Sequence, residues 1–191
     1  MKKLLLFIAI LIGIMYFLNK KHKRHQSADL YNKQILNKTN DKVVFISGLG
    51  KYSQKDLDFV SNEITKMFEV KCEIISPKKT NSGLYDIDGK LDFGTCERLF
   101  NCRNKTVYVT NEYMAVNREG VCGATSIFGN CILVCNRYKD LKNTVLHEVA
   151  HTLGLRHCKN KCIMLECNEI KGDNTLEFCN DCKLKLKTNL K

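Results

Sequence analysis

The chain has 191 residues and a formal net charge of +11 at pH 7, and this length suits one domain with appendages. The positive charge lies at the two ends: six Lys and Arg residues precede residue 26 and four Lys residues follow Cys182, with no acidic residue among them. Residues 26–182 are left with a net charge of +1, which argues against a nucleic-acid-binding domain, so no nucleic-acid partner is predicted.

An unbroken apolar run occupies residues 4–18, between two basic flanks. We predict that residues 1–18 are a single-pass membrane anchor, although a bilayer usually needs about 20 apolar residues and flanking lysines must then snorkel. The alternative is a cleaved signal peptide and a secreted protein, but no small-residue cleavage site follows Leu18.

Residues 19–40 are predicted to be a basic and polar tether that leads to a domain at residues 41–191. More positive charge follows the apolar run than precedes it, which places the domain on the cytosolic side of the membrane. The eleven cysteines agree with this, because an odd number cannot all be paired and zinc thiolates suit a reducing compartment.

The first part of the domain alternates between strand-like and helix-like patterns. Residues 54–68 carry apolar side chains at helical spacing and predict a helix packed on one face. Residues 80–92 are polar with two glycines and predict a loop. Buried strands are predicted at 43–46, 72–75, 106–110 and 132–134. The fold class is therefore α/β (α+β), with a mixed sheet and a crossover helix.

Three of the five histidines lie in the segment HEVAHTLGLRHC, residues 147–158. On a helix, His147 and His151 share one face, while Glu148 lies about 100° round from His147. Gly154 permits the left-handed conformation that ends helices, so the chain can turn back and bring in His157. Three protein ligands and one open position are typical of a catalytic zinc site.

This arrangement predicts a zinc-dependent metallopeptidase with a peptide or protein substrate. Zinc lowers the pKa of a bound water from about 15.7 to about 7, and the water attacks the peptide carbonyl while Glu148 acts as general base. The alternative is a non-catalytic, zinc-stabilised module that binds proteins or membrane. Such a module would need the three ligands but not the carboxylate of Glu148, which therefore favours an enzyme.

A second group of ligand-type residues follows directly. Cys158, Cys162, Cys179 and Cys182 include a C-x-x-C pair and predict a structural zinc site with four thiolates. Two disulfides or free thiols are the alternatives, and Cys167 competes for a place in the first pair. Buried free thiols are the expected state of five further cysteines: Cys96, Cys102, Cys122, Cys131 and Cys135.

The run H-E-x-x-H-x-x-G-x-x-H-C, with Cys162-x-Met164 and Cys179-x-x-Cys182 after it, resembles the archaemetzincin family of zinc metallopeptidases, in the metzincin clan. The resemblance implies a metzincin-like zincin with an active-site helix and a small C-terminal subdomain. It implies two zinc ions, one catalytic and one structural, and makes Met164 the Met-turn residue beneath the histidines. It also implies an edge strand within residues 123–135 that pairs with extended substrate. The chain departs from the family pattern in two places: the stretch between Cys158 and Cys162 and the stretch from Met164 to Cys179 are both shorter.

Overall fold

The structure is a computed structural model, and it describes residues 43–100, 102, 104–126, 129–137, 140–165 and 176–189. These residues all belong to one structural unit, Asp41–Lys191. The predicted anchor at residues 1–18 and the predicted tether at residues 19–40 lie outside the described residues, and both stay predictions. None of the helices in the described ranges combines the length and the apolarity that crossing a membrane requires.

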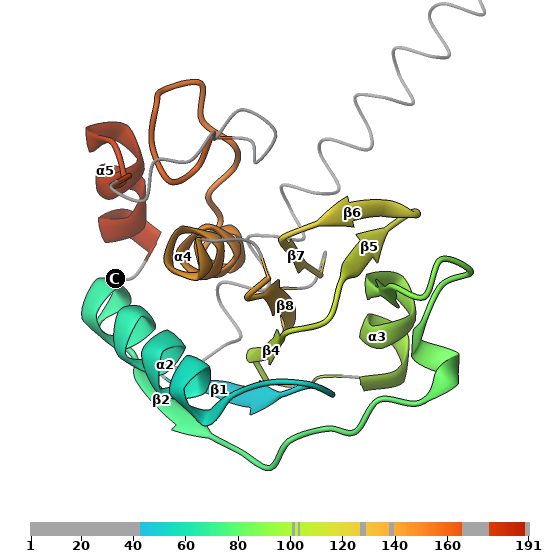
Figure 1. Ribbon diagram of the computed structural model, residues 1–191. Helices are drawn as coiled ribbons and strands as arrows, with labels where there is room; N and C mark the ends of the chain where they lie inside the picture. The colour runs from blue at the N-terminus through green and yellow to red at the C-terminus, as the bar shows by residue number, and fades with distance from the viewer. Residues whose placement is uncertain are drawn as a thin grey trace, which may run out of the picture. The chain divides into compact units, whose positions relative to one another are not determined.

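A five-stranded sheet forms the centre of the domain (Figure 1). Four of its strands run parallel, and the fifth, β7, is antiparallel and lies at one edge beside β8. The strand order is β2-β1-β4-β8-β7. The strands are β1 (Val43–Gly48), β2 (Lys71–Ile74), β4 (Thr106–Thr110), β7 (Gly123–Thr125) and β8 (Cys131–Cys135). The predicted mixed α/β fold is confirmed.

Helices α2 (Gln54–Phe68) and α4 (Leu141–Thr152) cover one face of this sheet. Helix α5 (Asn180–Asn189) lies on the same side and adds Cys182 and Leu186 to the same apolar cluster. The bounds of α2 match the prediction. Its start is set by Ser53, whose side chain accepts a hydrogen bond from the Asp56 backbone N–H at 3.1 Å. Its end is set by Glu69, which has left-handed backbone geometry with φ of 54°.

The other face of the sheet carries α3 (Phe93–Phe100) and a small second sheet of β3 (Leu91–Asp92), β5 (Met114–Val116) and β6 (Glu119–Val121). None of these elements was predicted; the strands have only two or three residues and leave no readable alternation in a sequence, and α3 has only eight residues. Residues 80–92 are largely irregular, as predicted, apart from a 3₁₀ turn, η1 (Ser82–Leu84), and β3.

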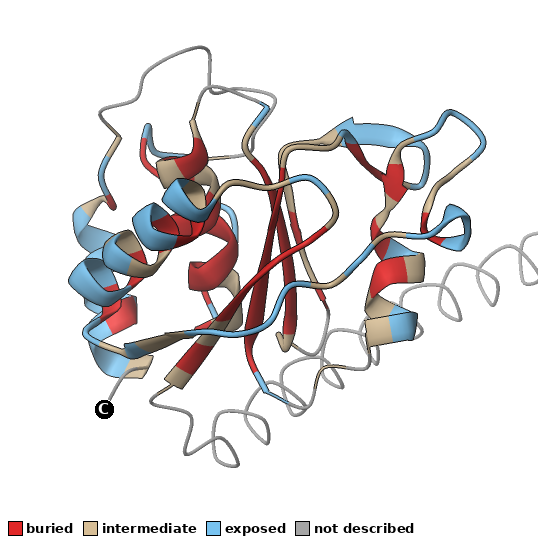
Figure 2. Cartoon of the chain, turned by 60° about the horizontal axis from the view of Figure 1, so that its bottom comes forward, coloured by how far each residue is buried: buried red, intermediate tan, exposed pale blue. Residues whose placement is uncertain are grey.

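Burial follows this layered arrangement (Figure 2). All five residues of β4 and all five of β8 are buried, because each strand has neighbours on both sides and is covered on both faces. Successive side chains alternate between the two cores: Ile132 and Val134 face the helices, and Leu133 faces α3. Helix α4 therefore packs on strands that are fully buried.

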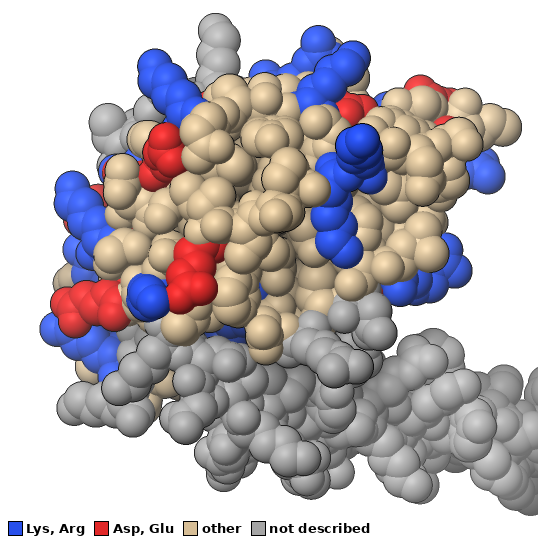
Figure 3. Space-filling model, turned by 90° about the horizontal axis from the view of Figure 1, so that it is seen from below, with Lys and Arg blue, Asp and Glu red and all other residues tan. Residues whose placement is uncertain are grey.

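Most charged side chains of the described residues lie on the outside of the domain, whereas Lys105 and Glu148 are buried. On the face shown in Figure 3, and among the residues that the structure describes, Lys and Arg stand singly or beside Asp and Glu rather than in one continuous patch. Ion pairs such as that between Lys71 and Glu73 are exposed, so they contribute little to stability.

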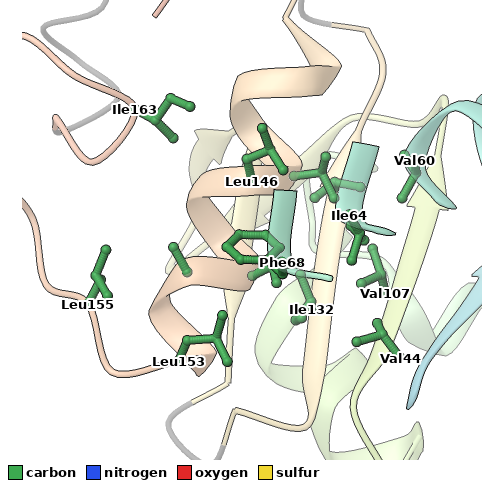
Figure 4. Packing of buried hydrophobic residues seen from close by; sticks show 14 of the residues in the cluster. Val44, Val60, Ile64, Phe68, Val107, Ile132, Leu146, Leu153, Leu155 and Ile163 are labelled. Atoms are coloured by element: carbon green, nitrogen blue, oxygen red, sulfur yellow. The ribbon is translucent and has the colours of Figure 1, made fainter. Parts of the chain in front are cut away.

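Helix α4 is held by apolar packing on two sides (Figure 4). Leu146 lies in the same cluster as Ile64 and Phe68 of α2, over Ile132 of the sheet. Ile163, from the segment after the helix, completes this cluster and is 1% exposed. The helix that carries the predicted ligands is therefore fixed both by the sheet and by the chain that follows it.

Candidate active site

The predicted site begins with a well-defined helix. Asp140 caps α4 by accepting a hydrogen bond from the backbone N–H of Asn143 at 2.9 Å. The helix ends before Gly154, whose φ of 84° is left-handed and whose N–H bonds to the His151 carbonyl at 3.0 Å. The predicted role of Gly154 in turning the chain back is confirmed.

The turn brings His157 to the two histidines of α4. The ring centroids lie 4.6 Å apart for His147 and His151, 5.2 Å for His147 and His157, and 4.9 Å for His151 and His157. One ring nitrogen from each residue lies within 4.8 Å of the other two. The structure thus brings together all three histidines that the sequence singled out.

Backbone carbonyls fix the orientation of two of the rings. Nδ1 of His147 lies 2.7 Å from the carbonyl oxygen of Ile163, and Nδ1 of His151 lies 2.8 Å from that of Leu155. A carbonyl oxygen only accepts hydrogen bonds, so each Nδ1 carries the hydrogen and each Nε2 is left with a lone pair.

The two Nε2 atoms lie 2.9 Å apart. Two lone pairs at this distance repel one another unless a cation lies between them. Two nitrogens on a tetrahedral zinc are about 3.3 Å apart, so the spacing is close to that of a zinc site. Burial lowers the pKa of His147 to about 4 and that of His151 as well, which keeps both rings neutral, as metal ligands must be. The residues present fit a zinc ion.

Glu148 lies on the side of α4 that faces strand β7. Its side chain is buried, and its Oε2 accepts a hydrogen bond from the hydroxyl of Thr125 at 2.5 Å. Burial raises the pKa of Glu148 to about 7, against the opposing effect of the Thr125 hydrogen bond. A carboxyl group with a pKa near neutrality is suited to take up and release a proton.

Gly123 makes room for this carboxylate. A Cβ atom at residue 123 would stand 2.7 Å from Cγ and 2.8 Å from Oε1 of Glu148, and 2.8 Å from Cγ2 of Thr144. Sequence patterns gave no indication of Gly123 or Thr125, because both are more than twenty residues from Glu148. Only the pairing of β7 with β8 places them beside it.

The four predicted cysteines also come together. One sulfur from each of Cys158, Cys162, Cys179 and Cys182 lies within 4.8 Å of the others. The Sγ atoms of Cys158 and Cys179 are 3.7 Å apart, close to the about 3.8 Å edge of a tetrahedron with zinc–sulfur bonds of about 2.3 Å. A disulfide would bring the sulfurs to about 2.05 Å, and the ten cysteines that the structure describes are all unbridged.

Groups around this cluster favour the thiolate form of Cys179, one of its two half-buried members. Hydrogen bonds from the Cys182 backbone and the Asn160 side chain lower the pKa of Cys179 to about 6. Cys162 is deeper, and burial raises the pKa of its thiol. Cys167, the predicted competitor for the first pair, lies outside the described residues.

One short segment links the histidine and cysteine clusters. The backbone N–H of Cys158 donates to the carbonyl of Met164 at 2.7 Å, and the adjacent Ile163 carbonyl accepts from His147. Met164 itself is fully buried in the helix-side core. This geometry couples the predicted Met-turn segment to both clusters. The other predicted free thiols, at residues 96, 102, 122, 131 and 135, are free and buried or half-buried.

Comparisons with known proteins agree with this geometry. A family model described as peptidase family M54 matches residues 133–188, which include β8, α4 and both clusters. Archaemetzincin from Archaeoglobus fulgidus is 20% identical over 145 residues, which cover 69% of this chain and 91% of the relative.

Two solved structures share the fold. The crystal structure of archaemetzincin from Archaeoglobus fulgidus, complexed with malonate, is similar with a TM-score of 0.65 and 20% identity, covering 75% of this chain and 99% of that one. The crystal structure of a zinc-dependent peptidase from Methanocorpusculum labreanum gives a TM-score of 0.56 and 16% identity, with 74% and 99% covered.

Fold, clusters and family model together define the class of this protein as a zinc-dependent peptidase. Over residues 133–188 the chain matches the model of peptidase family M54, and over 145 residues it is similar to an archaemetzincin. The resemblance read from the histidine and cysteine motifs is therefore confirmed, as is the predicted enzyme class.

Proposed function

We propose that the protein hydrolyses peptide bonds at a zinc ion held by His147, His151 and His157, with Glu148 as general base. The observation that carries the proposal is the pair of Nδ1–carbonyl hydrogen bonds, which turn the bare Nε2 atoms of His147 and His151 toward one point. When bound there, zinc supplies a Lewis acid that polarises the peptide carbonyl and acidifies a water.

The protein's own contribution to the chemistry is proton transfer by Glu148. Its carboxylate takes a proton from the attacking water and delivers it to the nitrogen of the leaving amine. A pKa raised by burial suits both halves of this cycle, since the group must accept the proton and then release it. The short bond to Thr125 leaves the second oxygen, Oε1, for the proton.

Strand β7 is the proposed docking site for the substrate. It is one of the two edge strands of the five-stranded sheet, and it lies next to the helix that carries the histidines. An extended peptide adds to such an edge through backbone hydrogen bonds. This places a scissile bond beside Glu148 whatever side chains the peptide carries. The proposed substrate class is therefore an extended peptide or protein segment.

A second zinc ion is proposed at Cys158, Cys162, Cys179 and Cys182, where it would have a structural role. Four thiolates close the coordination of zinc and leave no position for water. Met164 is proposed to form the floor of the histidine site, since it lies in the segment that connects the two clusters.

Attachment to a membrane through residues 1–18, with residues 41–191 on the cytosolic side, is also part of the proposal. Its support is the apolar run with basic flanks and the excess of positive charge after it.

The test compares the full-length protein with Glu148→Gln, which keeps the shape of the side chain and removes its basicity. Glu73→Gln on strand β2 is the matched control, since the Glu73 side chain is 42% exposed and forms a surface ion pair with Lys71. Zinc is measured by mass spectrometry, and cleavage is followed on a peptide library.

We expect about two zinc ions per chain in all three proteins, one in the open and one in the closed site. We expect cleavage by the wild type and Glu73→Gln, and a fall of about 10²- to 10⁴-fold in Glu148→Gln, the usual contribution of a general base. Equal activity in Glu148→Gln would refute the mechanism. A zinc-loaded wild type that cleaves nothing would instead favour the non-catalytic module.

A further inference from the structure

The carboxylate of Glu148 needs a partner that fixes its direction. A glutamate has three side-chain torsions, and proton transfer requires the accepting oxygen to lie within hydrogen-bonding reach of the water. Helix α4 fixes only the backbone of Glu148. The contacts that fix the side chain therefore come from another element of the fold, and this element is strand β7.

Thr125 supplies the contact. Its Oγ1 lies 2.5 Å from Oε2 of Glu148 and 3.0 Å from the backbone oxygen of the same residue. A hydroxyl has one hydrogen, and the carboxylate is the stronger acceptor, so the hydrogen goes to Oε2. The hydrogen bond is thus charge-assisted while Glu148 is ionised.

The position of the hydroxyl is itself well determined. Thr125 is the last residue of β7 and pairs with Ile132 of β8, which is fully buried. The branched Cβ of threonine restricts rotation about the first side-chain torsion. Two residues earlier in β7, Gly123 has no side chain and so leaves the space that the Glu148 carboxylate occupies.

We propose that Thr125 is a positioning residue for the reaction: its hydroxyl holds Oε2 of Glu148 and reserves Oε1 for proton transfer. The inference rests on the proposed role of Glu148 as general base. It assigns to strand β7 a second task beside substrate pairing, since the same strand that aligns the peptide would also aim the base.

A purely structural role for Thr125 would change different measured quantities from a positioning role. If the hydroxyl only tied β7 to α4 through the backbone oxygen of Glu148, its loss would lower stability, zinc content or substrate affinity. If the hydroxyl aims the carboxylate, its loss lowers kcat and leaves KM and zinc content unchanged, because the interaction matters only during proton transfer.

The experiment uses the full-length protein and three threonine variants. Thr125→Val removes the hydroxyl and keeps the shape, and Thr125→Ser keeps the hydroxyl. Thr106→Val is the matched control, because Thr106 is a buried threonine of the same sheet that donates to a backbone oxygen, that of Asn104, at 3.0 Å. Glu148→Gln is measured in parallel.

We expect Thr125→Val to lose about ten- to hundredfold in kcat, as a misaimed catalytic group does. Its KM should stay within about twofold of the wild type and its zinc content should be unchanged. Thr125→Ser should recover most of kcat, and Thr106→Val should keep wild-type kcat and KM.

Several results would overturn the inference. One is wild-type kcat in Thr125→Val while Glu148→Gln is inactive, which leaves the proposed function intact. Others are a loss confined to KM or zinc content, a Thr125→Ser variant as slow as Thr125→Val, and an equal loss in Thr106→Val. Full activity in Glu148→Gln would instead overturn the proposed function itself.

Discussion

A single added methyl group at residue 123 tests how closely the active-site helix fits strand β7. In Gly123→Ala the new Cβ would stand 2.7 Å from Cγ of Glu148 and 2.8 Å from its Oε1. Ordinary contact begins at 3.4 Å, so the carboxylate and the strand must separate by roughly 0.7 Å. The neighbouring Cγ2 of Thr144, also at 2.8 Å, limits the room for adjustment.

The displacement falls on a group that acts only if it is well placed. A misplacement of about 1 Å can cost about 10²-fold in rate, so Gly123→Ala is expected to lose between about ten- and hundredfold in kcat/KM. Zinc should be retained, because His147 and His151 are oriented by the carbonyls of Ile163 and Leu155 and not by β7.

The assay compares kcat/KM and zinc content with those of Gly94→Ala, the matched control. Gly94 lies in helix α3, and a Cβ there would meet its nearest neighbour, Oδ1 of Asp92, at an ordinary 3.7 Å. Alanine is a better helix former than glycine, so this control should be fully active. Wild-type kcat/KM in Gly123→Ala would refute the close fit of Glu148 against β7.

Two further predictions concern the cysteine cluster and the N-terminal segment. Cys182→Ser should reduce the zinc content from about two ions to one and lower Tm by on the order of 10 °C, because binding of structural zinc contributes directly to folding. The control Cys72→Ser lies outside the cluster and should keep both ions. Two zinc ions in Cys182→Ser would count against a four-cysteine site. Full-length protein should sediment with membranes and resist extraction by high salt, whereas a variant that lacks residues 1–18 should be soluble; equal behaviour of the two would argue against the anchor.

Much of the catalytic centre was predictable because its signal is local. His147, His151 and Glu148 lie on one helix, so their relative directions follow from 3.6 residues per turn. Gly154 marks the end of this helix through backbone sterics alone, and its φ of 84° agrees. The strands β4 and β8 were predictable because burial on both faces makes them continuously apolar.

The residues that surround Glu148 were not predictable, since they depend on which strand lies next to α4. Thr125 and Gly123 lie in a three-residue strand with no periodic signal, and only its antiparallel pairing with β8 brings them to Glu148. The orientation of the histidine rings likewise depends on carbonyls, and that of Ile163 comes from a separate segment folded against the helix.

The sequence by itself determined the histidine motif, the glutamate beside it, the four cysteines and the resemblance to archaemetzincins, because fixed spacing on one helix and in the segment after it carries that information. Only the tertiary structure showed that the ligand atoms of each cluster lie within 4.8 Å of one another, and that Thr125 of the edge strand β7 donates a hydrogen bond to the Glu148 carboxylate. The physical reason is that helix geometry is set by neighbours in the chain, whereas packing of a strand against a helix is set by burial and pairing across the whole domain.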